Sequence, residues 1–598
     1  MISSLFLRPL WALCLSLAAC SAPDRAENPP AAARAAVPAA PEIPAIPPLR
    51  TDTAGQAWVE RTLAGLSLRQ RVAQLVFPWI SGQSASANPG EQQRMLTWVT
   101  RDEVGGLIVS TGSPGALAGK LNAAQMRAGV PLLIVSDLET GPGMRLNPGG
   151  TRMPPAMAFG AADDTALARQ AGRATGAEAR AVGIHLTLGP VLDVNSNPAN
   201  PIINVRSFGE SPERVARLGA AWLLGARETG LLSVGKHFPG HGDTNVDSHV
   251  GLPQISGDSA RLAQVELAAF RGAMRAGMDG VLVGHIAAVG IEGPGAPPAS
   301  LSPRMIGMLR GPMEFRGIVF TDALNMGGVT RRYSVTEASI LALLAGADAL
   351  LQPPGHPQVI DGIVAAVESG RIPRPRIDEA ARRVLTAKAA AGLHRGARVD
   401  LGAVAGAVAT DAHRELARTV AARSITLARD RANAVPLRRG ARVLHVTYTD
   451  NGRGTAGGVL QRELAAGGVT AEHVRVGPAT PAATFTSLRT RAAAADVVIA
   501  SIAIAPFQYR SLGIGGGMPG FVEALSASGK PVVAVSLGSP YLLDAFPSVP
   551  AYLLAWDAGA AAEAAAARAL LGAIPITGRL PVSLPPHHRA GEGIDRRP

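Results

Sequence analysis

Short apolar runs alternate with amphipathic helical stretches from about residue 58 onward, and this alternation restricts the fold more than any other feature. Several runs are continuously apolar, which is typical of parallel strands with both faces buried. Helical stretches such as 164–181, 212–229 and 259–276 lie between the runs. Eight strand–helix units over about 300 residues predict an N-terminal (β/α)8 barrel of the TIM type. The expected strands are 75–79, 106–109, 132–136, 185–189, 233–236, 280–283, 317–321 and 347–351.

A second α/β region follows the barrel. Its four or five parallel strands predict a C-terminal doubly wound α/β sandwich domain rather than a second barrel. A glycine-rich stretch at 513–517 does not follow the strand-to-helix pattern of a dinucleotide site, so we interpret it as a loop. Its expected strands are 443–447, 497–502, 532–537 and 551–555, with a helix at 560–571.

The first twenty residues resemble a bacterial lipoprotein signal peptide. Arg8 supplies positive charge, and the apolar run 10–17 is too short to span a bilayer. The run ends in Leu-Ala-Ala-Cys, which resembles a lipobox, so we assign residues 1–20 to a lipoprotein signal segment and expect Cys20 to be lipidated and to become the mature N-terminus. Cys14 lies in the removed segment, which leaves no partner for a disulfide. An ordinary signal peptide with an incidental cysteine is the alternative.

Export and anchoring set the expected location. Ser21 follows the cysteine, which by resemblance to Gram-negative lipoproteins favours the outer membrane, facing the periplasm or the cell surface. Residues 21–50 are rich in Pro and Ala and predict an extended tether. The expected domains are then the barrel at 51–395, a helical connection at 396–422 and the second domain at 423–598.

The formal net charge of +12 does not indicate a nucleic-acid partner. Arginines are spread along the whole chain without a basic run, and aromatic residues that could stack on bases are few. The chain holds only four lysines: Lys120, Lys236, Lys388 and Lys530. In such a chain a lysine marks a position where a compact ammonium is required, and Lys236 is the clearest case.

Ionisable side chains follow several of the expected barrel strands. In a (β/α)8 barrel the functional groups lie at the carboxyl ends of the strands. A single polar residue there is commonly a cap, but five on one rim indicate a functional site. The five are Asp137, Lys236, His237, His285 and Asp322.

The loop after the fifth strand carries the sharpest motif. Its proline and glycines at 239–242 exclude a regular helix, and Asp247 and His249 follow two residues apart. A carboxylate at that spacing can accept a hydrogen bond from one imidazole nitrogen and make the other more basic. Three interpretations remain open: a catalytic Asp–His pair, a structural loop, or a metal site formed by His237, His241 and His249, for which no ligand spacing is evident.

These motifs resemble a known family. Lys-His-Phe-Pro-Gly-His-Gly at 236–242 and Asp-Ser-His at 247–249 are similar to the signature of glycoside hydrolase family 3 β-N-acetylglucosaminidases. The resemblance covers the barrel and extends into the second domain, and it departs from the family at Thr140, where a glycine is common. Further matching segments are 137–141 with Arg145, 206–210 and 320–326.

The resemblance implies a retaining, exo-acting β-N-acetylhexosaminidase without metal or organic cofactor. It implies that Asp322 is the nucleophile, His249 the acid/base and Asp247 the residue that orients His249. Its substrate would be a terminal β-linked GlcNAc on peptidoglycan fragments or chitin-type oligosaccharides. The implied sugar-binding residues are Asp137, Arg145, Arg206, Lys236 and His237.

Other functions remain open at this point. A β-glucosidase of the same family would take its acid/base from elsewhere, and the Asp–His loop argues against it. A GlcNAc phosphorylase is compatible with a histidine acid/base, because an imidazole repels phosphate less than a carboxylate does. A catalytically silent glycan-binding protein is the alternative from another class. The sequence leaves the oligomeric state and the role of the second domain undetermined.

Overall fold

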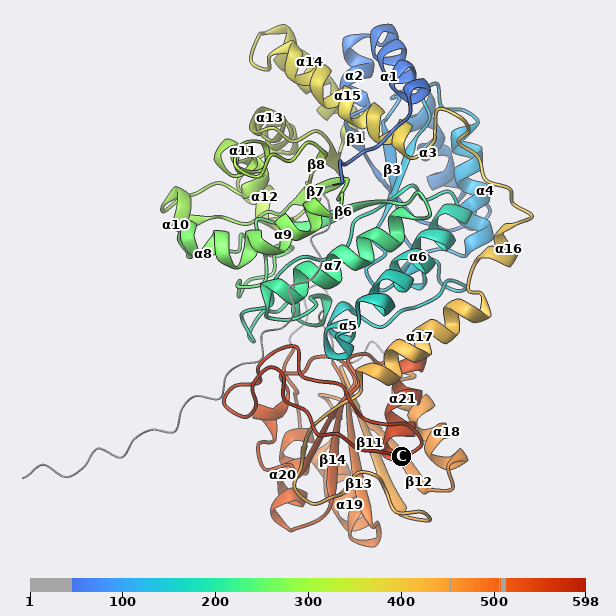
Figure 1. Ribbon diagram of the computed structural model, residues 1–598, viewed down its shortest axis with the longest axis vertical. Helices are drawn as coiled ribbons and strands as arrows, with labels where there is room; N and C mark the ends of the chain where they lie inside the picture. Colours follow the sequence, from blue (N-terminus) through green and yellow to red (C-terminus); the bar gives the residue numbers. More distant parts are fainter. Residues whose placement is uncertain (1–45, 451–453, 505, 507–511) are drawn as a thin grey trace, which may run out of the picture. The chain divides into compact units, whose positions relative to one another are not determined.

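The computed structural model describes residues 46–450, 454–504, 506 and 512–598 (Figure 1). The expected signal peptide, Cys20 and most of the tether lie outside these residues. The chain divides into two units, 1–43 and 44–598, and everything below concerns the second. No helix among the described residues is long and apolar enough to cross a membrane.

Parallel strands form a closed ring in the N-terminal half. The order β2-β3-β4-β5-β6-β7-β8 is closed by β9, which pairs with β1 and is joined to β8 by a bridge between Phe320 and Ala349. β1 and β2 form one barrel strand interrupted at Pro78, so the eight expected strand positions are all occupied. The strands are β1 (Val76–Phe77), β2 (Trp79–Ile80), β3 (Gly106–Val109), β4 (Leu133–Ser136), β5 (Leu186–Thr187), β6 (Leu232–Phe238), β7 (Gly280–Val283), β8 (Ile318–Thr321) and β9 (Leu350–Leu351).

Helices surround this ring, and local sequence explains where several begin. Asp164 accepts hydrogen bonds from the first amides of α6, and Ser211 caps α7, whose first residue is a proline. A β-carbon at Gly172 would lie 2.0 Å from the Trp222 carbonyl oxygen, so glycine allows α6 and α7 to pack closely. The helices are α1 (Thr53–Gly65), α2 (Leu68–Ala73), α3 (Pro89–Thr100), α4 (Pro114–Gln125), α5 (Ala156–Ala162), α6 (Thr165–Ala181), α7 (Pro212–Arg227), α8 (Ser259–Gln264), α9 (Glu266–Arg275), α10 (Val289–Glu292), α11 (Pro303–Arg310), α12 (Gly327–Thr330), α13 (Val335–Ala345), α14 (His356–Glu368) and α15 (Arg374–Ala390).

The prediction of one helix over 259–276 is wrong. The helix breaks at Val265, whose φ of −104° and ψ of −74° separate α8 from α9. The break precedes Glu266, whose side chain lies so close to Gly240 that a β-carbon there would approach Glu266 Cβ to 2.7 Å. The first turn of α9 is therefore packed against the loop after β6, a tertiary contact that helical periodicity cannot predict.

A six-stranded sheet forms the second domain, in the order β10-β15-β14-β13-β11-β12. Five of its strands are parallel, and β10 runs antiparallel to β15. The sequence predicted the four central strands and missed β10 and β12, because edge strands pair on one side only and carry polar side chains. The strands are β10 (Thr426–Asp430), β11 (Arg442–Thr449), β12 (Thr470–Val476), β13 (Val497–Ala503), β14 (Val532–Ser536) and β15 (Ala551–Leu554).

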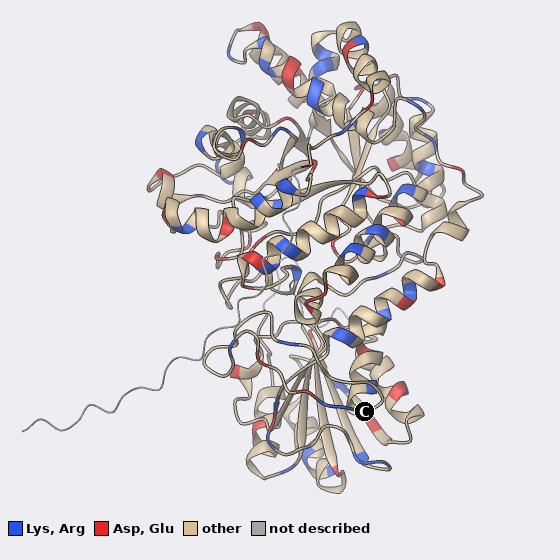
Figure 2. Ribbon diagram, viewed as in Figure 1, with Lys and Arg blue, Asp and Glu red and all other residues tan. Residues whose placement is uncertain are grey.

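Apolar clusters lie on both faces of this sheet, as a doubly wound domain requires. One cluster also includes Met157, Ala158 and Ala161 of α5, so the first half of the chain contributes to the core of the second. In Figure 2 the Lys and Arg residues are interspersed with Asp and Glu along the helices of both halves. The helices are α16 (Val404–Ala407), α17 (Asp411–Ser424), α18 (Gly458–Ala466), α19 (Ala482–Ala494), α20 (Met518–Ala527) and α21 (Ala560–Leu570).

Candidate active site

The five predicted rim residues lie at or just beyond the carboxyl ends of four barrel strands, β4, β6, β7 and β8. Asp137 directly follows β4 and Asp322 directly follows β8. β6 is longer than expected, so Lys236 and His237 belong to its last residues rather than to the loop beyond it. The strand therefore fixes the backbone of both residues, and their side chains are buried.

Two carboxylates and three cations form one network at this end of the barrel. The Lys236 ammonium lies 2.8 Å from Asp137 Oδ1 and 2.7 Å from Glu139 Oε1. Arg145 donates to Asp137 Oδ2 at 2.9 Å, and Arg206 donates to both oxygens of Glu139 at 2.8 and 2.9 Å. Four of these residues were predicted, and the structure brings them together. Glu139 was missed as a site residue, although it lies in the 137–141 motif.

Both carboxylates of this network are ionised. Burial alone would raise the pKa of Asp137, but Lys236 and Arg145 overcome burial and lower it to about 2. Burial opposes ionisation of Glu139 in the same way, and Arg206 and Lys236 hold its pKa well below the usual range. The network thus has one net positive charge, and it presents charged donors and acceptors suited to sugar hydroxyl groups.

The turn that carries Arg145 explains why this chain can have a threonine at position 140, where the family commonly has a glycine. Gly141 has a φ of 73°, in the left-handed region, and begins the short 3-10 turn η1 (Pro142–Met144) that ends at Arg145. Thr140 accepts a backbone hydrogen bond from Met153 at 2.9 Å. Only the second of these two positions requires a glycine conformation, so a threonine fits the first.

Asp193 is a buried carboxylate that the sequence analysis missed. It accepts hydrogen bonds from His237 Nδ1 at 2.7 Å and from the backbone amides of His237 and His241 at 3.1 and 2.7 Å. Burial raises its pKa and the nearby His237 lowers it, with a net lowering. Asp193 thereby fixes the His237 ring, whose Nε2 lies 3.5 Å from Arg206 Nη2. Asp193 lies six residues beyond β5, too far from the strand end to be recognised from sequence.

The second domain supports the loop that carries Asp193 and Arg206. Asn195 donates to the Tyr541 hydroxyl at 2.7 Å, and Asn204 donates to Ser539 Oγ at 3.1 Å. Both asparagines lie within two residues of a site residue. The C-terminal domain therefore acts on the site through the backbone of residues 193–206.

Asp247 and His249 meet in the loop after β6, as the spacing predicted. His249 Nδ1 lies 2.7 Å from Asp247 Oδ1, which also accepts the His249 backbone amide at 2.9 Å. The carboxylate therefore fixes the orientation and tautomer of the ring, and Nε2 is the nitrogen that can exchange a proton with a bound molecule.

This loop is joined to the chain just after Asp322. The amides of Gly327 and Gly328 donate to the carbonyl oxygens of His249 and Ser248 at 3.2 and 3.1 Å. A β-carbon at Gly327 would lie 2.8 Å from the His249 oxygen, so only glycine permits this approach. The two backbones that carry Asp322 and His249 are thus held together directly.

His241 holds the loop after β6 in place through two side-chain hydrogen bonds. Its Nδ1 lies 2.6 Å from Thr244 Oγ1, and its Nε2 lies 3.1 Å from Ser248 Oγ. Burial and the nearby His237 lower the pKa of His241 to about 4, so the ring is neutral. Within the described residues, no group of three or more His, Cys, Asp or Glu side chains is arranged to hold a metal ion.

Asp322 is an ionised, partly buried carboxylate close to three histidines. Burial raises its pKa, but His285, His237 and His249 outweigh burial and lower the pKa overall. One carboxylate oxygen accepts the Ala323 amide at 2.8 Å. His285, expected on the rim, is fully buried; it lies 2.7 Å from Ser300 Oγ and 3.0 Å from the Ala323 carbonyl oxygen, and so braces the segment after Asp322.

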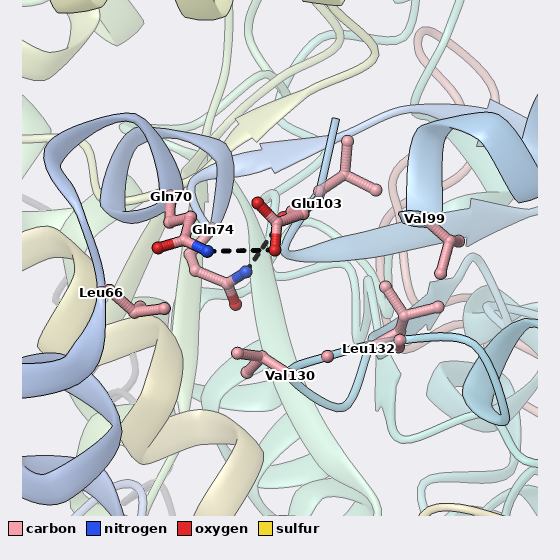
Figure 3. Close-up of a pocket in the computed structure, with 10 residues that line it drawn as sticks. Leu66, Gln70, Gln74, Val99, Glu103, Val130 and Leu132 are labelled. Carbon is pink, nitrogen blue, oxygen red and sulfur yellow. Dashed lines mark hydrogen bonds between the residues drawn. The ribbon is translucent and has the colours of Figure 1, made fainter. Parts of the chain in front are cut away.

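Two small cavities lie in the barrel domain, one bordering this network and one far from it. One, of about 20 Å³, lies behind Glu139 and Arg206 and is lined by Phe159 and Trp222. The other, of about 10 Å³, lies at the opposite, amino-terminal end of the strands, where Gln70 donates to Glu103 at 3.1 Å (Figure 3). Each has room for about one water molecule.

Comparison with known proteins supports both halves of the architecture. Residues 67–387 match the glycosyl hydrolase family 3 N terminal domain, and residues 321–594 match the C-terminal domain of the same family. The chain is 32% identical to a β-N-acetylglucosaminidase/β-glucosidase of Cellulomonas fimi over 66% of this chain and 70% of that protein. It is 32% identical to the β-hexosaminidase LpqI of Mycobacterium tuberculosis over 58% of this chain and 89% of the relative.

Solved structures show the same arrangement. A family 3 β-N-acetylglucosaminidase from Paenibacillus sp. aligns with a TM-score of 0.78 and 33% identity, over 86% of this chain and 99% of that one. The β-glucoside phosphorylase BglX aligns with a TM-score of 0.80 at 24% identity, over 90% of this chain and 97% of that one, a likeness that concerns the fold alone.

Proposed function

Because the chain belongs to glycosyl hydrolase family 3, we propose that it is a retaining, exo-acting β-N-acetylhexosaminidase that releases terminal β-linked GlcNAc. The observation that carries this proposal is the Asp247–His249 hydrogen bond, in a loop joined by backbone hydrogen bonds to the segment after Asp322. The relatives and the Paenibacillus structure, whose names state N-acetylglucosaminidase or hexosaminidase activity, support the same substrate class.

In the first step of the proposed reaction, a carboxylate oxygen of Asp322 forms a bond to the anomeric carbon. The bond from that carbon to the glycosidic oxygen breaks, and the leaving oxygen takes the proton from His249 Nε2. The products are a glycosyl ester on Asp322 and a free aglycone. Asp322 suits this role because the surrounding histidines keep it ionised despite its burial.

In the second step a water molecule replaces the aglycone. Neutral His249 accepts a proton from the water, whose oxygen bonds to the anomeric carbon, and the Asp322 carboxylate is released. Two inversions at one carbon give net retention. An imidazole suits both steps, because its ordinary pKa of about 6.5 allows it to donate and accept a proton near neutral pH.

The charged network around Lys236 is the proposed sugar-binding site. Asp137 and Lys236 present an acceptor and a donor to neighbouring hydroxyl groups, and Arg145 and His237 extend the set. Arg206 is already engaged at both oxygens of Glu139. We therefore assign Arg206 a supporting role in addition to the direct contact that the resemblance implies.

We also propose that the protein is exported and anchored through lipid on Cys20, with peptidoglycan fragments or chitin-type oligosaccharides as substrates. The lipobox and the tether support anchoring. Fractionation tests it: the parental protein is expected in outer-membrane fractions, and Cys20→Ser in soluble fractions. A Cys20→Ser protein that stays with the membranes contradicts the lipid anchor.

Hydrolysis of 4-nitrophenyl β-N-acetylglucosaminide tests the enzymatic assignment. Asp322→Asn is expected to lower turnover at least about 10⁴-fold, as loss of a nucleophile does elsewhere. Asp361→Asn, a change at an exposed carboxylate on α14, is the matched control and should keep the parental rate. A parental rate in Asp322→Asn refutes the assignment.

The same assay separates the rival activities. A faster rate on the corresponding aryl glucoside would make the enzyme a β-glucosidase. Sugar 1-phosphate formed in phosphate buffer would make it a phosphorylase, and binding of GlcNAc without turnover would make it a glycan-binding protein. NMR of the first-formed product should show the β-anomer.

A further inference from the structure

Large apolar side chains are exposed on the sheet end that carries the proposed site. Six large apolar side chains are exposed among the described residues, and three of them, Trp79, Val246 and Val250, lie at this end; the others are Met126, Leu344 and Leu401. Trp79 is in β2, and Val246 and Val250 flank the Asp247–His249 pair. Trp79 is the largest of the six and is 44% exposed, although it belongs to a barrel strand. An indole so exposed favours contact with a partly apolar ligand.

Strand register places Trp79 on the inner face of the barrel. In a parallel sheet, paired residues on neighbouring strands point to the same face, and side chains alternate along each strand. Asp137 lies two residues beyond Val135 and Lys236 four beyond Leu232, so Trp79 faces the same interior as these two site residues. The register pairs are Trp79–Ile108, Ile108–Val135, Val135–Leu186 and Leu186–Leu232.

The strand register on the other side of the barrel, from β8 through β9 to β1, also places Trp79 on the inner face. Phe320 bridges to Ala349, so Asp322 is level with Leu351, which pairs with Phe77. The Phe77 and Phe320 rings also touch edge to face, with centroids 5.6 Å apart, as two inward side chains would. Asp322 is therefore level with Phe77. Trp79 lies two residues beyond Phe77, so Trp79 is one layer of side chains closer to the barrel mouth than Asp322.

Standard sheet spacings give the approximate separation between Asp322 and Trp79 from this register. Two steps between neighbouring strands are about 10 Å, and two residues along a strand are about 7 Å. In the proposed reaction Asp322 attacks from inside the barrel, and the leaving group departs from the opposite face, toward the mouth. An indole displaced from Asp322 toward the mouth is thus placed beside the leaving group rather than beside the attacked carbon.

We propose that Trp79 is the platform for the first sugar ring of the aglycone. The indole would cover the apolar face of a pyranose, and Val246 and Val250 would add apolar surface to the same barrel mouth from the loop that carries His249. The preferred substrate is then β-GlcNAc linked to another pyranose, as in a disaccharide or longer glycan, rather than GlcNAc on a small leaving group. This inference rests on the proposed N-acetylhexosaminidase activity.

Two substrates that differ only in the leaving group test the platform. N,N′-diacetylchitobiose has a pyranose leaving group, and N-acetylglucosaminyl β-fluoride has none. Trp79→Ala is expected to lower kcat/KM roughly three- to tenfold on the disaccharide and less than twofold on the fluoride. Trp79→Phe should recover most of the loss, and Leu401→Ala, which removes an equally exposed apolar side chain elsewhere, should change neither value.

The ratio of the two kcat/KM values is independent of the folded fraction, because both substrates are measured on one preparation. An equal loss on both substrates would place Trp79 beside the attacked sugar or give it a structural role, and would overturn the proposal. No loss on either substrate would overturn it as well. If the parental enzyme hydrolyses neither substrate, the proposed function fails, and that outcome is distinct from a failure of the platform.

Discussion

Replacing Lys236 by Met removes the buried cation that two partly buried carboxylates, Asp137 and Glu139, share. The side chain of Lys236 is only 4% exposed and contacts both Asp137 and Glu139. Met has a similar length and fills the same space without charge. The change therefore leaves Asp137 with Arg145 alone and Glu139 with Arg206 alone.

The pKa of Asp137 gives the scale of the loss. Its fall from 3.8 to about 2 is produced against burial by Lys236 first and Arg145 second. At about 1.4 kcal/mol per pKa unit, this is roughly 2 kcal/mol of favourable interaction. Glu139 adds a further loss, and breaking a buried ion pair typically costs about 3–5 kcal/mol. We expect Lys236→Met to lower the free energy of unfolding by about 2–4 kcal/mol at pH 7.

Urea unfolding at several pH values measures this difference. A carboxylate with a lowered pKa stabilises the fold above its ordinary pKa and stops doing so as pH falls through its folded value. The gap between the parental protein and Lys236→Met should thus be full above about pH 5 and shrink between about pH 4 and 2. The kcat/KM should fall about 100-fold, since the sugar site loses a donor and its geometry.

Lys120→Met is the matched control. The Lys120 side chain is 1% exposed, pairs with Glu91 and donates to the Ser81 carbonyl oxygen after β2. It should cost similar stability while kcat/KM stays within about twofold of the parental value. Lys236→Met would refute the reasoning if its stability loss were below about 0.5 kcal/mol, or if its kcat/KM equalled that of Lys120→Met.

Three further changes have expected outcomes. Gly327→Ala should push the His249 loop away from its backbone contact and lower kcat/KM by about tenfold or more, whereas Gly307→Ala, with open space around it, should leave kcat/KM unchanged. His249→Ala should lose at least about 100-fold on chitobiose but much less in the glycosylation step of a dinitrophenyl glycoside, whose leaving group needs no proton; equal losses would refute its role as the acid. Burial lowers the pKa of Lys388 to about 7, so the parental protein should gain stability relative to Lys388→Met as pH rises from 7 to 10, by up to about 1.4 kcal/mol per unit in urea titrations. A pH-independent difference would contradict that pKa.

The strand ends were predictable because they depend on local pattern. Buried parallel strands are continuous apolar runs, and the residue after each run must lie at one end of the barrel. Asp137 and Asp322 could thus be assigned to the same rim from sequence. The contact between Asp247 and His249 was predictable for a similar reason, since two residues of separation in a loop leave few arrangements.

Asp193 and Glu139 were missed because their partners are distant in sequence. Asp193 matters through the ring of His237 and the amide of His241, more than forty residues away. Glu139 matters through Lys236, at the end of β6, and Arg206, in the long loop after β5. β10 and β12 were missed for a similar reason. Their sequences carry polar side chains, and they become strands only because they pair with the edges of the sheet.

The segment from Lys236 to His249, the end of β6 and the loop after it, separates what the sequence determines from what the tertiary structure decides. Its residues alone indicated an Asp–His pair beside a barrel strand, because spacing and glycine content act over a few residues. Closing the ring placed Trp79 on the face shared with Asp137 and Lys236, and joined the His249 backbone to Gly327. These relations depend on strand register and on close backbone approach, which are decided only when segments far apart in the chain pack together.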